Sequence, residues 1–271
     1  MGLVGATEVL LDVAVSVARE AAALAMSSRP SAIHDVDTKT SKTDVVTAAD
    51  VAVEKLVRSR LSELRPGEPV FGEETGGAQA APGQVCWVVD PIDGTVNYLY
   101  GLPWYAVSLA AQVDGVSVAA AVVEPETGRE WTALRGGGSW RNGVELRVST
   151  ATRLDMALVS TGFGYRAELR SWQAAGIARL LPKVRDIRRP GAASLDLCSV
   201  AAGWVDGYVE HGLSRWDWAG GALVAEEAGA VVRLPTSADA VGPGLIFCAT
   251  PGIADQLLAA VKEVGLTEQT P

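Results

Sequence analysis

A short apolar run at residues 86–89 leads directly into two aspartates, Asp90 and Asp93. Consecutive apolar residues of this kind predict a buried strand, so the two carboxylates stand where that strand ends. Pro91 lacks a backbone N–H and stiffens the turn between them, while Gly94 lets a ligand approach the backbone closely. The Asp-x-x-Asp pattern by itself is also typical of a capped turn with solvated carboxylates. When outward-pointing amides follow, however, such a strand end can bind a cation and a phosphate together.

The rest of the chain has the periodicities of a mixed α/β protein. Helical spacing of apolar residues predicts helices at residues 3–28, 48–64, 168–180, 192–202, 218–228 and 252–264. Apolar runs predict strands at residues 69–71, 86–89, 104–112, 116–123, 129–134, 156–160, 185–189, 205–210, 230–234 and 244–249. The Arg29-Pro30 pair is expected to end the first helix. We therefore expect an antiparallel N-terminal lobe over residues 1–148 and a mixed C-terminal lobe over residues 149–271, joined in one compact unit.

The charge balance argues against one class of partner. The 271 residues include 32 acidic and 23 basic side chains, which gives a formal net charge of −9. A protein that binds duplex nucleic acid normally has the opposite balance, so no nucleic-acid partner is expected. If the substrate is an anion, something other than net charge must attract it, and a bound cation is the obvious candidate.

The cysteines and the apolar segments indicate the compartment. Cys86, Cys198 and Cys248 are odd in number, widely spaced and embedded in apolar sequence, which is typical of reduced core thiols. They form no sequence cluster with His34 or His211, so a zinc site is not expected. No uncharged run without helix breakers reaches the roughly 18 residues of a membrane span, and no targeting pattern opens the chain. We expect a cytoplasmic protein that does not enter a membrane.

Further acidic residues stand at the ends of predicted elements. Glu73 follows Gly72 where a short predicted strand closes. Asp217 lies between two tryptophans, where a carboxylate without a partner would be costly to place. Asp50 opens a predicted helix behind Thr47, and a capping role explains that position at least as well as a functional one.

These acidic segments occur together in a known family. They are DPIDGT at 90–95, GEE at 72–74, TAAD at 47–50 and WDWAGGALVAEEAGA at 216–230. In this order and spacing, with Lys39 upstream and the segment at 190–212, they resemble the signature set of the inositol monophosphatase family, most closely its bacterial SuhB-like branch. That family belongs to the magnesium-dependent, lithium-sensitive sugar-phosphate phosphatases. The resemblance implies a layered α-β-α-β-α fold, lithium sensitivity and a homodimer.

The resemblance also implies a set of metal ligands. Glu73, Asp90 and the backbone carbonyl of Ile92 would hold a first magnesium ion, and Asp90, Asp93 and Asp217 would hold a second. Glu73 would also reach a third, weaker ion through water, so that each site binds two or three ions. Magnesium prefers such hard oxygen ligands, and ordinary carboxylates are ionised at neutral pH.

Catalytic roles follow from the same resemblance. Thr95 and Glu73 would orient the attacking water, with Asp50 hydrogen-bonded behind them. The metal would activate that water for attack on phosphorus and stabilise the departing alkoxide.

Substrate contacts are implied as well. The amides of Gly94 and Thr95 would receive the phosphate, whereas Ala193 and Glu210 would face the alcohol part of the substrate. Asp217 would lie near the leaving oxygen. If Glu210 has no such role, its position at a strand end predicts a solvated edge residue.

The sequence therefore favours a phosphoric monoester hydrolase of the inositol-1-monophosphatase class, acting on myo-inositol 1-phosphate or another small phosphorylated polyol. Histidinol phosphate, fructose 1,6-bisphosphate and 3′-phosphoadenosine phosphate are alternative substrates, although the compact chain has no obvious insertion for a second phosphate or an adenine. A regulatory binding protein on the same fold is a further alternative. Its expected mark is a replaced ligand, and this sequence keeps all of Glu73, Asp90, Asp93, Thr95 and Asp217.

Overall fold

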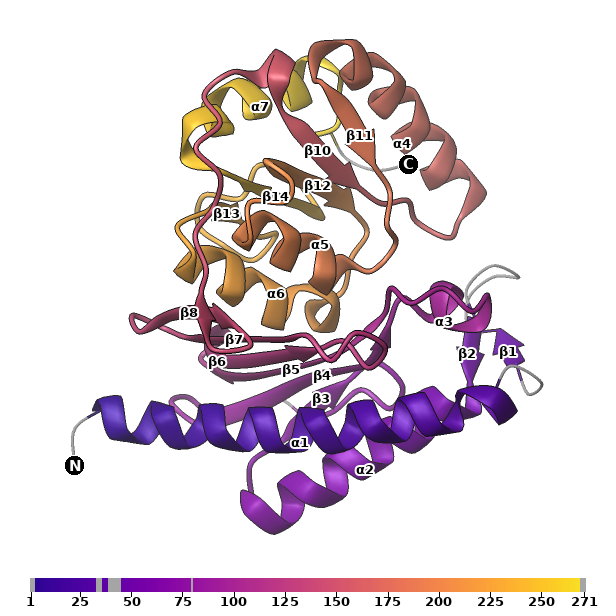
Figure 1. Ribbon diagram of the computed structural model, residues 1–271, viewed down its shortest axis with the longest axis vertical. Helices are drawn as coiled ribbons and strands as arrows, with labels where there is room; N and C mark the ends of the chain where they lie inside the picture. Colours follow the sequence, from indigo (N-terminus) through magenta and orange to yellow (C-terminus); the bar gives the residue numbers. More distant parts are fainter. Residues whose placement is uncertain (1–2, 33–35, 39–44, 79, 269–271) are drawn as a thin grey trace.

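The structure is a computed structural model that describes residues 3–32, 36–38, 45–78 and 80–268 (Figure 1). Its helices are α1 (Leu3–Ala32), α2 (Ala48–Leu64), α3 (Thr95–Leu99), α4 (Ala167–Leu180), α5 (Ala193–Ala201), α6 (Arg215–Glu227) and α7 (Pro251–Glu263). Its strands are β1 (Val36–Thr38), β2 (Val45–Thr47), β3 (Val70–Gly72), β4 (Val85–Asp93), β5 (Ala106–Val113), β6 (Val116–Val123), β7 (Glu130–Leu134), β8 (Gly138–Arg141), β9 (Val144–Glu145), β10 (Leu158–Thr161), β11 (Asp186–Arg188), β12 (Gly207–His211), β13 (Val231–Arg233) and β14 (Leu245–Ala249).

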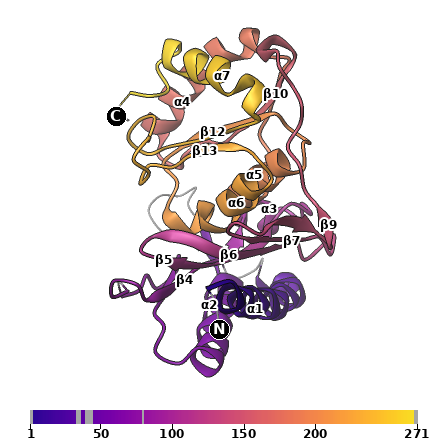
Figure 2. The same cartoon turned by 90° about the vertical axis from the view of Figure 1, so that its left-hand side faces the viewer.

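The two larger sheets are stacked with helices between and outside them (Figures 1 and 2). The first has seven strands in the order β3-β4-β5-β6-β7-β8-β9, and the second has five in the order β11-β10-β12-β14-β13. Helices α1 and α2 pack on the outer face of the first sheet, α5 and α6 lie between the sheets, and α4 and α7 cover the second. The expected α-β-α-β-α layering is therefore confirmed.

Each sheet has apolar side chains on both faces because helices cover both. The central strand β5 reads Ala-Val-Ser-Leu-Ala-Ala-Gln-Val, and all but its last residue are buried. Alternate residues of β5 enter the outer core with α1 or the inner core with α6. Such continuous burial makes β4 and β5 a rigid base for the residues at the end of β4. The three cysteines are buried free thiols, as expected.

Helix α1 continues to Ala32, so the prediction that Arg29-Pro30 ends it was wrong. A proline so close to the last residue removes only one hydrogen bond of the final turn. Arg29 also anchors this end, because its guanidinium donates to the carbonyl oxygens of Tyr98, at 2.8 Å, and Leu102, at 2.9 Å.

The expectation of an antiparallel first half needs one correction. Strand β3 runs parallel to β4, whereas the other neighbours in the seven-stranded sheet are antiparallel. Strands β8 and β9 were not predicted, because their short runs lie between glycine turns and carry little apolar periodicity. The lobe boundary at residue 148 stays a prediction.

Candidate active site

Asp90 and Asp93 lie at the irregular end of β4. Asp90 pairs with Ser108 of β5 and Asp93 pairs with Ala106, so one residue of β5 faces two of β4. In a regular strand, residues three apart point to opposite faces, but the extra residue brings both carboxylates to one side. The carboxylate Oδ1 of Asp90 accepts the Ile92 amide at 3.1 Å, which fixes the bulge.

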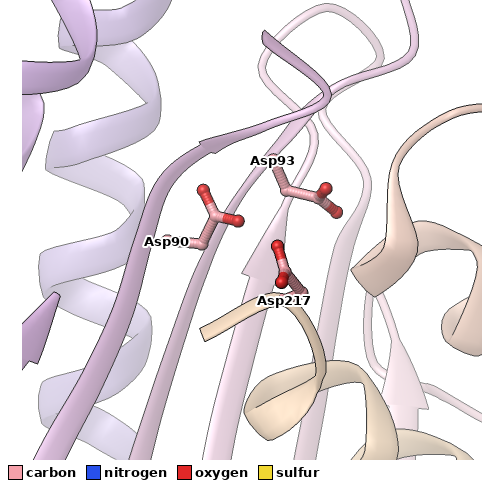
Figure 3. A group of neighbouring side chains, drawn as sticks. All are labelled: Asp90, Asp93 and Asp217. Carbon is pink, nitrogen blue, oxygen red and sulfur yellow. The ribbon is translucent and has the colours of Figure 1, made fainter. Parts of the chain in front are cut away.

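Asp217 reaches the same place from the first turn of α6. Its Oδ2 accepts the Ser214 amide at 2.5 Å in a capping box, so the helix start itself orients the carboxylate. One carboxylate oxygen from each of Asp90, Asp93 and Asp217 lies within 4.8 Å of the other two, and the three side chains are neighbours (Figure 3). Segments more than 120 residues apart in the sequence thus form one cluster.

The electrostatics of this cluster favour a bound cation. Burial, reinforced by the charges of Glu73 and of the other aspartates, raises the pKa of Asp90 and of Asp217 well above the ordinary value. Burial also raises the pKa of Asp93 to about 6, although hydrogen bonds from Ser194 oppose the shift. A divalent cation among these oxygens would offset their mutual repulsion and favour their ionised forms. The residues therefore fit magnesium, a hard cation with oxygen ligands.

The first turn of α5 holds Asp93. The amides of Ala193 and Ser194 donate to its two oxygens at 3.1 and 2.8 Å, and the Ser194 hydroxyl donates to Oδ2 at 2.5 Å. Ala193, expected to face the substrate alcohol, does line the cleft, but its amide binds Asp93. Ser194 was missed, because nothing in its local sequence indicates a partner 101 residues away.

Thr95 links the β4 end to α2. Its hydroxyl contacts Oδ1 of Asp50 at 3.5 Å and donates to the Ile92 carbonyl oxygen, the expected metal ligand, at 3.0 Å. Oδ2 of Asp50 accepts the Thr47 amide at 2.8 Å and the Thr47 hydroxyl at 2.6 Å. Asp50 therefore completes a capping box and also meets Thr95, so the structural and functional interpretations of this residue are compatible. Before Thr95, Gly94 has a φ of 88°, which a residue with a side chain rarely adopts.

A cleft of about 500 Å³ contains these groups. It is lined by Glu73, Asp90, Ile92, Asp93, Gly94, Thr95, Ala193, Glu210 and Asp217, and by residues that were not predicted, including Tyr165, Arg166, Arg189 and Trp216. A larger, shallower groove of about 1140 Å³ lies between α1 and strands β7 and β8, away from the aspartate cluster. Lys39, part of the family resemblance, lies outside the described residues.

Glu210 lies across the cleft, on the central strand β12. Because β12 is flanked by β10 and β14, Glu210 is not a solvated edge residue. The Tyr208 hydroxyl donates to its Oε2 at 2.6 Å, and burial raises the pKa of Glu210 to about 7. A partly buried carboxylate at this position can accept a hydrogen bond from a substrate hydroxyl.

Within the described ranges, no helix combines the length and apolar character that crossing a bilayer requires. The roles assigned to individual site residues stay predictions. The other predicted site residues line one cleft, whereas Asp50 lies behind Thr95 and does not line it.

Comparisons with known proteins identify the family of this chain. The model of the inositol monophosphatase family matches residues 6–266. An inositol-1-monophosphatase of Mycobacterium leprae is 50% identical, with 94% of each chain covered. A protein of Escherichia coli named Nus factor SuhB is 35% identical, with 94% of this chain and 96% of the relative covered. The solved structure of Mycobacterium tuberculosis SuhB has a TM-score of 0.81 at 43% identity, over 94% of this chain and 96% of that one. The chain belongs to the inositol monophosphatase family.

Proposed function

We propose that this protein hydrolyses a small phosphate monoester in a magnesium-dependent reaction, with myo-inositol 1-phosphate as its substrate. The clustering of two buried aspartates and the half-buried Asp217 beside the Gly94–Thr95 backbone carries this proposal. A phosphate monoester repels such a cluster unless cations are bound there, whereas the loaded cluster attracts it. The name of the M. leprae relative supports the choice of substrate.

In this reaction the predicted site residues have separate parts. Magnesium, when bound, supplies Lewis-acid stabilisation of developing negative charge and lowers the pKa of water. The Thr95 hydroxyl and the Glu73 carboxylate orient the attacking water, and Asp50 holds Thr95. The amides of Gly94 and Thr95 receive the phosphate oxygens, and Asp217 lies beside the leaving oxygen.

The far side of the cleft suits a polyol. Glu210 accepts a hydrogen bond from a ring hydroxyl. The positive charges of Arg189 and Arg166 at the rim favour the approach of an anion. The intact acidic set favours turnover over a purely regulatory role on the same fold. Lithium sensitivity, the homodimer, the cytoplasmic location and the absence of a nucleic-acid partner stay predictions.

Phosphate release from a panel of monophosphates, with chelator-treated protein and with added magnesium, tests the proposal. The panel includes inositol 1-phosphate, histidinol phosphate, fructose 1,6-bisphosphate and 3′-phosphoadenosine phosphate. We expect the highest kcat/KM for inositol 1-phosphate, activity only with magnesium, and nearly none in Asp93→Asn.

Asp155→Asn is the matched control, because Asp155 is exposed and pairs with Arg153. Undiminished turnover by chelator-treated Asp93→Asn would contradict the metal-dependent mechanism. If the protein strongly prefers another phosphate of the panel, the proposed substrate is wrong and the metal-dependent mechanism still holds.

A further inference from the structure

Glu73 stands on a small closed loop at the edge of the first sheet. The loop follows the three-residue strand β3, and reciprocal hydrogen bonds of 3.0 Å join the backbones of Gly72 and Gly76. An edge strand this short gives the loop only one neighbour, β4, within the sheet. The orientation of Glu73 therefore needs support from outside the sheet.

Helix α2 supplies that support through Glu54, whose side chain is only 1% exposed. Its carboxylate accepts the Glu74 amide at 2.7 Å, the Thr75 amide at 3.2 Å and the Thr75 hydroxyl at 2.5 Å. The two amides that follow Glu73 in the chain are thus bound to one buried carboxylate. Because these bonds are to a charged acceptor, they are stronger than ordinary backbone bonds.

Arg58 completes the arrangement one helical turn later. Its Nε donates to Glu54 at 2.9 Å, and its two terminal nitrogens donate to the carbonyl oxygens of Val70, at 3.0 Å, and Gly76, at 2.5 Å. The guanidinium therefore bridges the backbone before and after the loop. Asp50, Glu54 and Arg58 are spaced four residues apart on α2, so all three lie on one side of the helix and face the active-site segments. Asp50 contacts Thr95 there.

Gly72 shows how closely helix and loop approach. A Cβ atom at residue 72 would lie 2.5 Å from the carboxyl carbon of Glu54, so a larger residue would displace the Glu54 carboxylate from the loop. The glycine at the start of the GEE segment is thus explained by the Glu54 carboxylate.

We propose that Glu54, held by Arg58, is a positioning residue for Glu73: it fixes the loop backbone so that the Glu73 carboxylate meets the cation. This inference rests on the proposed function in so far as Glu73 is a magnesium ligand there. Because Glu54 binds the two amides that follow Glu73, loss of its charge acts directly on the loop that carries Glu73.

Isothermal titration of the full chain with magnesium alone, in the absence of substrate, tests the proposal. Glu54→Gln keeps the shape of the side chain but loses the charge, and its amide group cannot accept all the loop donors. We expect its magnesium dissociation constant to rise roughly tenfold, the usual effect of losing a group that orients a metal ligand. Glu63→Gln is the matched control on the same helix, since Glu63 is 58% exposed and paired with Arg60; it should bind magnesium as the wild type does.

A second substitution separates positioning from stability. In a Glu73→Gln background, Glu54→Gln should add no further loss of magnesium affinity, because its effect passes through Glu73. If Glu54→Gln lowers the melting temperature but binds magnesium normally, or adds its full effect in the Glu73→Gln background, the proposal is wrong.

Thr75→Ala keeps the proposal testable even if Glu54→Gln does not fold. Thr75 is exposed, so its loss is compatible with folding, and it should weaken magnesium binding by two- to threefold, with Thr75→Ser restoring it. Wild-type magnesium affinity in Thr75→Ala would contradict the proposal that the Glu54–loop contacts position Glu73. In another outcome, the wild type binds magnesium more tightly than Glu54→Gln and yet releases no phosphate from any substrate of the panel. In that case the positioning role of Glu54 stands and the proposed function is wrong. If the wild type binds no magnesium, both fall.

Discussion

Each aspartate of the cleft is already held by a donor of the protein. Asp90 accepts the Ile92 amide, Asp93 accepts groups of Ser194, and Asp217 accepts the Ser214 amide. The carboxylates are therefore fixed in place although their charges repel one another. Preorganisation of this kind favours cation binding and leaves the metal-free protein under electrostatic stress.

That stress predicts an unusual pH dependence. The pKa values of Asp90, Asp93 and Asp217 are higher in the folded protein than in the unfolded chain, so the folded state binds more protons. The extra bound protons stabilise the folded state at low pH. This stabilisation is lost as pH rises through the folded pKa, which for Asp93 is about 6. In chelator, unfolding by denaturant should show the wild type to be less stable at pH 8 than at pH 5.

Asp90→Asn should relieve part of this stress. The amide oxygen can still accept from Ile92, while one buried negative charge is removed. At pH 8 in chelator we expect the variant to be more stable than the wild type by roughly 1 kcal/mol or more, the equivalent of about one pKa unit. Magnesium should stabilise the wild type and not the variant. A variant less stable than the wild type at pH 8 in chelator would show that repulsion is not the dominant effect.

Glu210→Gln is expected to change substrate choice more than chemistry. At pH 8, above the pKa of about 7, Glu210 is mostly ionised and accepts a polyol hydroxyl. Its loss should lower kcat/KM for inositol 1-phosphate by a factor that corresponds to roughly 1–3 kcal/mol of transition-state binding, the scale for hydrogen bonds to charged groups. Kinetics with glycerol 2-phosphate as the second substrate give the ratio. Equal losses for both substrates would place Glu210 in the metal site or the fold.

At the scale of elements, the N-termini of α5 and α6 converge on the aspartate cluster. Helix α5 gives Asp93 two amides and a hydroxyl, whereas α6 contributes Asp217 itself. The partial positive charge of a helix start is therefore directed at the carboxylates, which helps them remain ionised.

Ser194→Ala removes only the hydroxyl from this arrangement. We expect magnesium affinity to fall roughly tenfold, as for other groups that orient a metal ligand, with both backbone amides still bound to Asp93. The control is Ser199→Ala in the same helix, where the hydroxyl donates to Leu195 and not to the site. Calorimetric titration of both variants makes the measurement, and equal affinities would contradict the prediction.

The sequence predicted most elements, and the exceptions have physical causes. The bounds of α2 were correct because Thr47 caps its start and Pro66-Gly67 follows its end. The end of the first helix was predicted wrongly at Arg29-Pro30, because sequence patterns do not show that Arg29 is anchored by the distant Tyr98 carbonyl. The site residues came from a family resemblance, while Ser194 and Glu54 could not be found, since their partners are distant in sequence.

At the scale of the whole molecule, the cleft draws on different layers. Asp90 and Asp93 belong to the first sheet, Asp217 to the helical layer between the sheets, and Glu210 to the second sheet. A cation bound by Asp90, Asp93 and Asp217 therefore joins neighbouring layers, and its binding free energy adds to the stability of the folded chain.

Magnesium should accordingly stabilise the whole protein. At a concentration one hundred times the dissociation constant, linkage predicts about 2.7 kcal/mol of added stability. Thermal unfolding with and without chelator should show a higher melting temperature with magnesium in the wild type and in Asp155→Asn. Asp217→Asn should lose most of this increase. An equal increase in Asp217→Asn would mean that magnesium acts elsewhere.

The extra residue between Asp90 and Asp93 also limits how far this motif can be transplanted. A designer who copies Asp-Pro-Ile-Asp onto a regular antiparallel strand would send one carboxylate to each face of the sheet. The graft must include the neighbouring strand as well, with one residue at the position of Val107 facing both Pro91 and Ile92. The unit that can be transplanted is thus the pair of strands with its β-bulge, and the four-residue motif alone is not sufficient.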